Sequence, residues 1–351
     1  MKAPYYVAGV YVEITSICNL RCIHCYNDSG KEKNEISVEA FQNILEAYNN
    51  TEFSLAISGG EPLLHPKFWE LVKLAKEKGI SDILIITNGT QITEDIAKKL
   101  AEYDISVQIS LNGINAETHD QICGKGAFEK TIKGIEYLIN AGHKDIVIRS
   151  MIAKCNKTQL LEFIDTMSKK NISTISFGNI SVQGRGVDNK DSLCMSTEEN
   201  EKILEMLREN EITKAAEEKG IRIDIPGASY NSGCPILHPS EKEIPITPRI
   251  DAKGNVYLCQ SFEGEVYSFG NVYDSKLTDI MDSLAFDNFI KFCQMSLCYM
   301  QDCNSCVWQN VCGRGCIAEA ASRGALQFTD GHCEYRNKQY ADKLIKEQSW
   351  N

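Results

Sequence analysis

The sequence lacks the features that mark membrane, secreted and disordered proteins. No run of 18 apolar residues occurs, and the first residues lack the apolar core of a secretory signal. Proline, glycine and glutamine are not enriched, which excludes a fibrous or disordered chain. Basic residues, 37 against 48 acidic ones, are too few for broad binding to nucleic acid or an anionic membrane. We therefore expect a cytoplasmic, globular protein with no nucleic-acid and no membrane partner.

Cysteine is the residue that the chain has in excess. The 351 residues are enough for about two domains, and 15 of them are cysteine. Disulfides are rare in a reducing compartment, where clustered cysteines are more often metal ligands or redox groups. The places where the cysteines cluster therefore carry most of the functional information.

Six β-rich runs alternate with segments of helical period in the first half of the chain. In the first helical segment, Phe41, Ile44 and Tyr48 fall on one face. This alternation indicates repeated βα units around a parallel sheet. The predicted strands are residues 10–14, 53–58, 83–87, 105–111, 146–152 and 173–177.

The fourth predicted strand has one apolar and one polar face. Ile105, Val107, Ile109 and Leu111 alternate with Ser106, Gln108, Ser110 and Asn112. In a partly closed barrel the apolar face would pack on the helices, and the polar face would look into a ligand-holding interior. The alternative is an exposed antiparallel strand.

The regular pattern ends near residue 225. A helix is predicted over about 197–217, and prolines crowd the sequence from Pro226 onward. Residues 246–250 and 256–258 then flank a turn and predict a β-hairpin. We place a domain boundary here, with residues 1–225 as one domain and 226–351 as a second.

The first cysteine cluster follows the first predicted strand. Cys18, Cys22 and Cys25 lie in one short loop, where three thiolates can bind three corners of an iron-sulfur cube and leave the fourth iron open. An open metal position can bind a substrate or a cofactor. A zinc site is the alternative, with His24 as a fourth ligand, although its place between two cysteines makes that awkward.

A second motif, Gly59-Gly60-Glu61-Pro62, ends the second predicted strand. Together with the CxxxCxxC loop it resembles the radical S-adenosylmethionine (SAM) superfamily, whose fold is a partial (βα)6 barrel. The resemblance implies a [4Fe-4S] cluster on Cys18, Cys22 and Cys25, with SAM bound to the open iron. One electron would cleave SAM to methionine and a 5'-deoxyadenosyl radical, which abstracts a substrate hydrogen. The protein would contribute positioning and exclusion of water.

The same resemblance implies the SAM contacts, although it identifies no catalytic acid or base. Gly59, Gly60 and Glu61 would receive the SAM amino group, and Asn88 matches the end of the third strand. The remaining implied contacts are Ser110 and Asn112 with the ribose or carboxylate, Arg149 with the carboxylate, and Tyr26 near the adenine. A structural ion pair for Arg149 and plain packing for Tyr26 remain as alternatives.

Seven further cysteines are spaced in the last third of the chain. They are Cys234, Cys259, Cys303, Cys306, Cys312, Cys316 and Cys333. Their order resembles the cysteine-rich SPASM extension of radical SAM enzymes, which binds two auxiliary [4Fe-4S] clusters. A zinc ribbon is the alternative for the four central cysteines.

The resemblance implies an interleaved ligation of the two auxiliary clusters. Cys303, Cys306, Cys312 and Cys333 would hold one cluster, which leaves Cys234, Cys259 and Cys316 for the other. That second cluster is one ligand short. Either a distant residue such as Cys194 or Cys298 completes it, or it keeps an open iron that could bind substrate.

The resemblance to SPASM enzymes predicts an oxidoreductase that matures a ribosomally made peptide. The product would be a thioether, a carbon-carbon crosslink or an epimerised residue. Alternatives are a small-molecule enzyme acting on a carbohydrate, cyclitol or tetrapyrrole, and a non-enzymatic zinc-binding interaction protein. Sulfatase-maturase-like oxidation is disfavoured, because Gln260 stands where those relatives place an aspartate base.

The expected partners follow from the same interpretation. A peptide substrate needs recognition of its leader, and only 17 residues precede Cys18. We therefore expect leader binding to be absent, supplied by a separate leader-binding protein, or built into the core. The electron would come from a reductant such as flavodoxin or ferredoxin.

Overall fold

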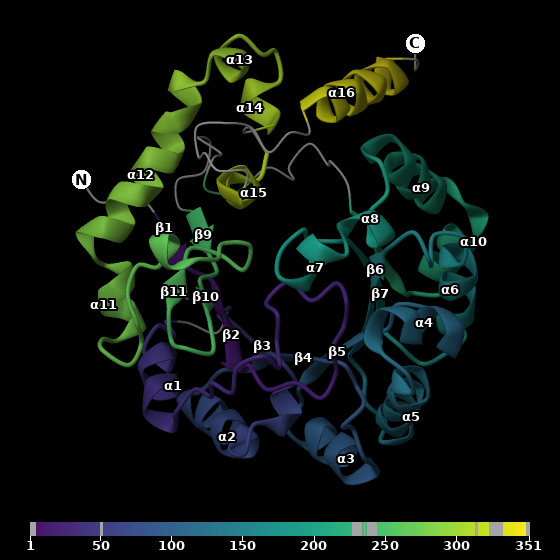
Figure 1. The fold of residues 1–351 in the computed structure, drawn as a ribbon, viewed down its shortest axis with the longest axis vertical. Helices are drawn as coiled ribbons and strands as arrows, with labels where there is room; N and C mark the ends of the chain where they lie inside the picture. Colours follow the sequence, from purple (N-terminus) through teal and green to yellow (C-terminus); the bar gives the residue numbers. More distant parts are fainter. Residues whose placement is uncertain are drawn as a thin grey trace.

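The structure is a computed structural model that describes residues 5–49, 52–226, 234, 236, 244–312, 315–322 and 333–348. A curved sheet forms its centre, and helices cover the outside of the sheet (Figure 1). Among the described residues, no helix is both long and apolar enough to span a lipid bilayer.

Six parallel strands form the body of the sheet, and each matches a strand predicted from the sequence. In β4, β5 and β6, buried residues alternate with partly exposed ones, so that one face of the sheet packs on the helices and the other faces the interior. The six strands are β2 (Gly9–Thr15), β3 (Ser54–Gly59), β4 (Asp82–Thr87), β5 (Ser106–Ser110), β6 (Ile146–Ile152) and β7 (Thr174–Asn179).

Connecting helices pack their apolar faces on the outer side of this sheet (Figure 1). Several begin at a side chain that caps free backbone N–H groups, such as Ser37, Thr93 and Asn115. The covering elements are α1 (Val38–Leu45), the 3-10 turn η1 (Pro62–Leu64), α2 (Phe68–Lys78), α3 (Glu94–Glu102), α4 (Ala116–Cys123), α5 (Ala127–Asn140) and α6 (Leu160–Met167).

The two faces of β5 confirm the predicted division between core and interior. Val107 and Ile109 are fully buried, whereas Gln108 and Ser110 on the other face are partly exposed. The sheet has the order β11-β10-β2-β3-β4-β5-β6-β7-β8, and no pairing closes β8 onto β11 in the described part. The fold is therefore α/β with an open, partial barrel, as the sequence predicts.

The prediction of a single helix over about 197–217 is wrong in one respect. The chain forms two helices, α9 (Thr197–Glu209) and α10 (Glu211–Glu218), separated at Asn210. Asn210 is extended, with ψ 141°, and its side chain caps α10 by accepting a hydrogen bond from the N–H of Ile212. Asparagine competes for backbone hydrogen bonds in this way, which interrupts an otherwise regular helical pattern.

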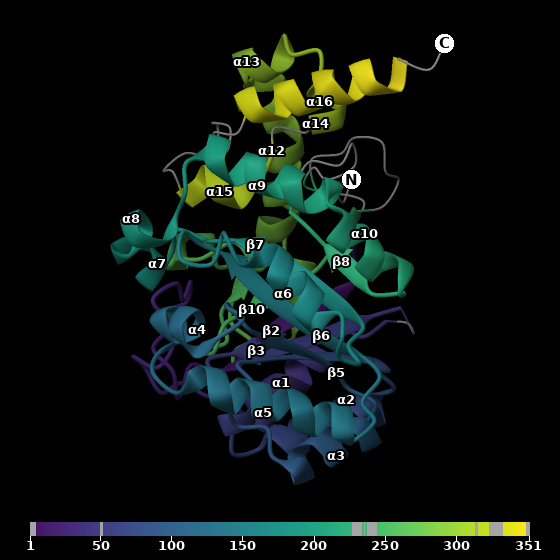
Figure 2. The ribbon, with the colours of Figure 1, turned by 90° about the vertical axis from the view of Figure 1, so that its right-hand side faces the viewer.

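The C-terminal third adds short strands and a group of helices. Figure 2 shows helices α12 to α16 gathered at one end of the molecule, far from α3. The remaining elements are β1 (Tyr5–Val7), α7 (Arg185–Asp188), α8 (Lys190–Leu193), β8 (Arg222–Asp224), β9 (Ile244–Ile246), β10 (Arg249–Ile250), β11 (Val256–Tyr257), η3 (Glu265–Tyr267), α11 (Leu277–Met281), α12 (Leu284–Tyr299), α13 (Gln301–Asn304), α14 (Gln309–Cys312), α15 (Ile317–Ser322) and α16 (Cys333–Gln348).

The predicted hairpin exists, and it belongs to the main sheet. Strands β10 and β11 pair antiparallel, while β10 also pairs in parallel with β2. Strand β9 likewise pairs in parallel with β1. Segments on the far side of the predicted boundary at residues 225 and 226 thus return to the first strands, and the division into two domains stays a prediction.

A buried ion pair joins β10 to β2. Arg249 of β10 donates from Nε to Glu13 Oε1 over 2.8 Å and from Nη2 to Glu13 Oε2 over 3.1 Å. The two side chains are only 6% and 5% exposed. Arg249 Nη1 also donates to the carbonyl of Phe262 over 2.7 Å. The guanidinium therefore joins β2, β10 and the loop after β11 at one point.

We expect Arg249→Met to lower the free energy of unfolding by about 3–5 kcal/mol, because Glu13 would become an uncompensated buried carboxylate. The double variant Glu13→Gln, Arg249→Met removes both charges and should recover most of that loss. Urea denaturation under reducing conditions measures all three proteins. Lys169→Met, which breaks an exposed ion pair with Asp165, is the control and should cost less than about 1 kcal/mol. A double variant no more stable than Arg249→Met would contradict this explanation.

Candidate metal centre

The three N-terminal cysteines lie in the loop after β2, at the carboxyl end of the parallel strands. Cys18, Cys22 and Cys25 are partly buried, and the N–H of Cys25 donates to the carbonyl of Cys22 over 3.2 Å. This end of a parallel barrel is where ligand sites are built, because the loops that follow the strands converge there. In the described part of the chain, no three His, Cys, Asp or Glu side chains close around one single metal ion.

Gly59 and Gly60 are required by the backbone of that same loop. A Cβ at Gly59, which has φ +132°, would stand 2.2 Å from the carbonyl oxygen of Thr15. One at Gly60 would stand 2.1 Å from the carbonyl oxygen of Ile17. The N–H groups of Gly60 and Glu61 donate to these two oxygens over 2.7 and 2.8 Å. The two glycines therefore let the cysteine loop lie directly against the end of β3.

Glu61 is fully buried and links the ends of β3 and β4. Its carboxylate accepts hydrogen bonds from the Thr87 hydroxyl over 2.7 Å and from the N–H of Asn88 over 2.9 Å. Burial raises the pKa of Glu61 to about 7, and it outweighs the hydrogen bonds to the carboxylate, which lower the pKa. Asn88, the other predicted residue here, places its Nδ2 4.0 Å from Cys18 Sγ and 3.0 Å from Asn19 Oδ1. Asn88 thus contacts the cysteine loop directly.

Arg149 and Ser110 lie on the same face of the sheet. Ser110 is paired in register with Arg149, and Arg149 with Ser176, whose hydroxyl accepts a hydrogen bond from the guanidinium over 2.9 Å. Gly178 leaves room for Arg149, because a Cβ there would stand 2.8 Å from Arg149 Nη2. No carboxylate of the described chain forms an ion pair with Arg149, and burial lowers its pKa. The structural ion pair considered as an alternative is therefore absent among these residues.

Asn112 is buried, and its side chain forms hydrogen bonds to two other segments of the chain. Its Oδ1 accepts from the N–H of Met151 over 2.8 Å, and its Nδ2 donates to Cys123 Sγ over 3.4 Å. Asn156 and His119 bond to the backbone of Asn112. Sequence reasoning did not identify these supporting residues, because contacts across strands leave no local signal. A SAM contact through Asn112 stays a prediction.

Tyr26 follows Cys25 and belongs to a buried polar group. Its hydroxyl lies 3.0 Å from Glu13 Oε1 and 3.0 Å from the Tyr11 hydroxyl. The guanidinium carbon of Arg249 lies 5.8 Å from the centre of the Tyr26 ring. Burial raises the pKa of Tyr26 well above 10, so the phenol stays protonated. The side chain of Tyr26 thus connects the cysteine loop to the ion pair described above.

The cysteines of the C-terminal third fall into separate stretches of chain. Cys303 and Cys306 form a tight turn, in which the N–H of Cys306 donates to the carbonyl of Cys303 over 3.1 Å. Cys312 ends α14, and Cys333 begins α16. The other predicted ligands, Cys234, Cys259 and Cys316, are partly buried against the main core.

Cys259 and Cys316 interact electrostatically, and a shared cluster for these two cysteines stays a prediction. Burial raises the pKa of Cys259, and the charge of Cys316 adds to that rise. Cys194 packs instead with Cys22 around Ile122 and Cys123, in a different apolar group. The assignment of Cys194 to the second auxiliary cluster stays a prediction. The side chain of Cys298 lies outside the described part.

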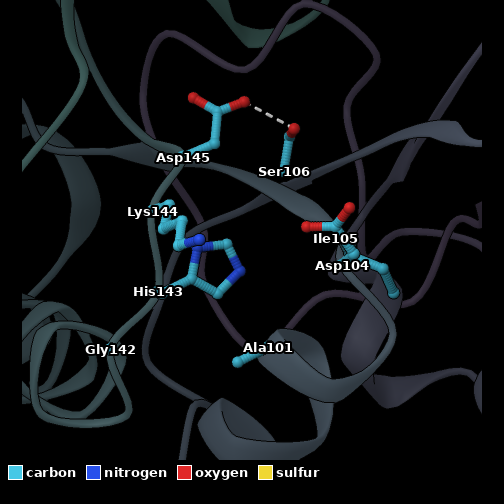
Figure 3. A pocket seen from close by; sticks show the side chains of 8 residues that line it. All are labelled: Ala101, Asp104, Ile105, Ser106, Gly142, His143, Lys144 and Asp145. Atoms are coloured by element: carbon cyan, nitrogen blue, oxygen red, sulfur yellow. Dashed lines mark hydrogen bonds between the residues drawn. The ribbon is translucent and has the colours of Figure 1, made fainter.

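A hollow of about 180 Å³ lies at the opposite end of the strands (Figure 3). Asp145 there accepts hydrogen bonds from the hydroxyls of Ser106 and Ser173 over 2.5 and 2.6 Å. None of the predicted site residues lines this hollow. Its lining residues are Ala101, Asp104, Ile105, Ser106, Gly142, His143, Lys144 and Asp145.

Two family models match the chain. Residues 12–167 match the radical SAM superfamily, and residues 247–307 match SPASM, an iron-sulfur cluster-binding domain. The first model implies a [4Fe-4S] cluster with SAM, and the second implies auxiliary iron-sulfur clusters. The partly buried thiols in both matched regions fit that donor chemistry.

Curated relatives differ in how much of their length is matched. A mycofactocin maturase of Mycolicibacterium smegmatis, MftC, is 36% identical over 198 residues, or 56% of this chain and 50% of the relative. The chain thus spans about half the length of the first curated relatives it matches. An Fe-coproporphyrin III synthase of Methanosarcina barkeri is 28% identical over 91% of this chain and 86% of its own.

Solved structures share the fold. Streptococcus suis SuiB bound to its precursor peptide SuiA superposes with a TM-score of 0.72 at 16% identity, covering 93% of this chain and 75% of that one. The fold of this chain is therefore shared with that structure.

The raised pKa of Glu61 predicts how stability depends on pH. The folded state binds this proton more tightly than the unfolded chain, whose pKa is near 4.5. The contribution of Glu61 is therefore greatest below pH 4.5 and is lost as the pH rises through about 7. Between pH 5 and pH 8 we expect the wild type to lose about 2 kcal/mol more than Glu61→Gln. Urea denaturation at a series of pH values measures this difference, and parallel pH profiles would contradict it.

Proposed function

Because the chain carries a radical SAM domain and a SPASM iron-sulfur domain, we propose that it cleaves SAM reductively and modifies a ribosomally made peptide. The observation that carries the proposal is the loop of Cys18, Cys22 and Cys25, which lies at the carboxyl end of the strands and packs directly against Gly59 and Gly60 at the end of β3. The relatives named as maturases and the SuiB structure with its precursor peptide support the substrate class.

The proposal assigns a role to each of these residues. Cys18, Cys22 and Cys25 hold the cluster, which when bound supplies the electron that splits SAM into methionine and a 5'-deoxyadenosyl radical. The Arg149 guanidinium binds the SAM carboxylate, since a planar fork can grip both oxygens. Ser110, on the same face, contributes its hydroxyl to the ribose or carboxylate.

The other predicted contacts act through the backbone or by shape. Gly59 and Gly60 present the end of β3 to the SAM amino group without side chains in the way. Tyr26, held by Glu13 and Tyr11, presents a fixed ring to the adenine. Asn88 keeps the loop in place beside Cys18. Together these residues orient SAM and exclude water, so that the radical meets only the substrate.

Auxiliary clusters complete the proposed cofactor set. Cys303, Cys306, Cys312 and Cys333 hold one, and Cys234, Cys259 and Cys316 hold three irons of the other. An open iron there could accept an electron from the modified substrate or bind a substrate thiolate. Iron and sulfide near 12 each per chain are expected for three [4Fe-4S] cubes, or roughly four of each per cube.

We expect the anaerobically reconstituted protein to form 5'-deoxyadenosine when dithionite and SAM are added. Cys22→Ala should abolish this product, because the cluster would lose a ligand. Cys155→Ser removes a partly buried thiol that is not a proposed cluster ligand and should retain it. Mass spectrometry of 5'-deoxyadenosine, with iron and sulfide analysis, makes the measurement. Iron-loaded wild type that never cleaves SAM would overturn the proposal, and so would zinc without sulfide.

A tetrapyrrole is the second candidate substrate. The Methanosarcina barkeri relatives named for porphyrin and haem synthesis match 91% and 95% of this chain over nearly their whole length. Fe-coproporphyrin III added to the reconstituted enzyme distinguishes the two candidates. A changed porphyrin mass with an equivalent amount of 5'-deoxyadenosine would favour the tetrapyrrole. An unchanged porphyrin, together with modification of a candidate precursor peptide, would support the peptide.

A further inference from the structure

A segment far along the chain, which includes α7, forms hydrogen bonds to the cysteine loop. Arg185, the first residue of α7, donates its backbone N–H to the carbonyl of Cys25 over 3.0 Å and its Nε to the carbonyl of Cys22 over 2.8 Å. Asn189, which follows α7, donates its Nδ2 to the carbonyl of Ile23 over 3.2 Å. Three carbonyls of the stretch from Cys22 to Cys25 thus point at this one segment.

Gly184 permits that close approach. Its φ is +50°, and a Cβ there would stand 2.4 Å from the carbonyl oxygen of Tyr26 and 2.6 Å from that of Cys25. Any other residue would push Arg185 away from the loop. The local backbone is therefore built around the contact between Arg185 and the cysteines.

The guanidinium of Arg185 also contacts the chain just after the three cysteines. Its Nη1 lies 2.6 Å from Asp28 Oδ1 and 3.1 Å from the carbonyl of Ser29. The side chains of Arg185 and Asp28 are 20% and 38% exposed, so solvent screens them only in part. The guanidinium also donates to the carbonyl of Cys22, so its charge lies next to the loop that carries the thiols of Cys22 and Cys25. A positive charge and its counter-charge thus flank two of the three proposed cluster ligands.

We propose that Arg185 is a positioning residue of the cysteine loop, and that Arg185 and Asp28 together set the reduction potential of the cluster held there. The inference rests on the proposed function, because it requires the cluster. Reduction adds negative charge to the cluster, which a nearby cation stabilises and a nearby anion opposes. Arg185 raises the potential, and Asp28 lowers it.

Two charge-removing variants test this by shifts of opposite sign. Arg185→Gln removes the less exposed cation and leaves Asp28 with only the exposed Lys31 as its counter-charge, so the midpoint potential of the N-terminal cluster should become more negative. Asp28→Asn leaves Arg185 unbalanced, so the midpoint should become less negative. Anaerobic redox titration followed by electron paramagnetic resonance measures both, in protein whose auxiliary clusters are retained. Lys169→Gln removes an equal charge from an exposed pair and should leave the midpoint unchanged.

A third variant separates charge from geometry. Arg185→Lys keeps the positive charge but cannot donate in the planar fork to Cys22 and Asp28 together. It should lower the iron retained on the N-terminal cluster about twofold or more, with the midpoint of the remainder close to wild type. If Arg185→Gln takes up no cluster at all, the shift in Asp28→Asn still decides the electrostatic role.

Different outcomes identify which idea fails. Wild type that takes up iron and sulfide and cleaves SAM, with midpoints unchanged in Arg185→Gln and Asp28→Asn, overturns the inference and leaves the proposed function intact. Shifts of the same sign in both variants also overturn it, because they indicate a general loosening of the loop. Wild type that binds no iron-sulfur cluster overturns both.

Discussion

The buried ion pair between Glu13 and Arg249 is the interaction on which the arrangement of the two cysteine regions depends. Glu13 lies on the strand that runs into the first cysteine loop, and Arg249 also holds the carbonyl of Phe262, three residues after Cys259. Removing two charges from water is costly, and only good geometry with further hydrogen bonds offsets that cost. Tyr26 supplies one of those further bonds. One bidentate contact therefore joins the strand that leads into the N-terminal cysteine loop to the segment that carries Cys259.

Most of the sheet could be predicted because its information is local. Each βα unit shows its own hydrophobic period, and the alternation along β5 identified the interior face that Ser110 shares with Arg149. The cysteine loop was equally clear, since three thiols within eight residues need no tertiary contact to be noticed. These features depend on residues that lie close together in sequence.

Features that depend on distant partners could not be predicted in the same way. Nothing near Arg249 in sequence indicates that it meets Glu13, and nothing near Asn112 indicates its bond to Met151. The break at Asn210 depends on a competition between side-chain and helical hydrogen bonds that hydrophobic periodicity does not record. Arg185 was missed for the same reason, because its contacts to Cys22 and Cys25 join segments about 160 residues apart.

The pairing of β2 with β10 also sets an order of events while the protein is made. Glu13 and Arg249 are separated by 236 residues, which take roughly 10 to 50 seconds to synthesise at about 5–20 residues per second. During that interval β3 can pair with one edge of β2, while the other edge has unsatisfied backbone groups. The first cysteine loop therefore leaves the ribosome long before the strand that carries it has both of its neighbours.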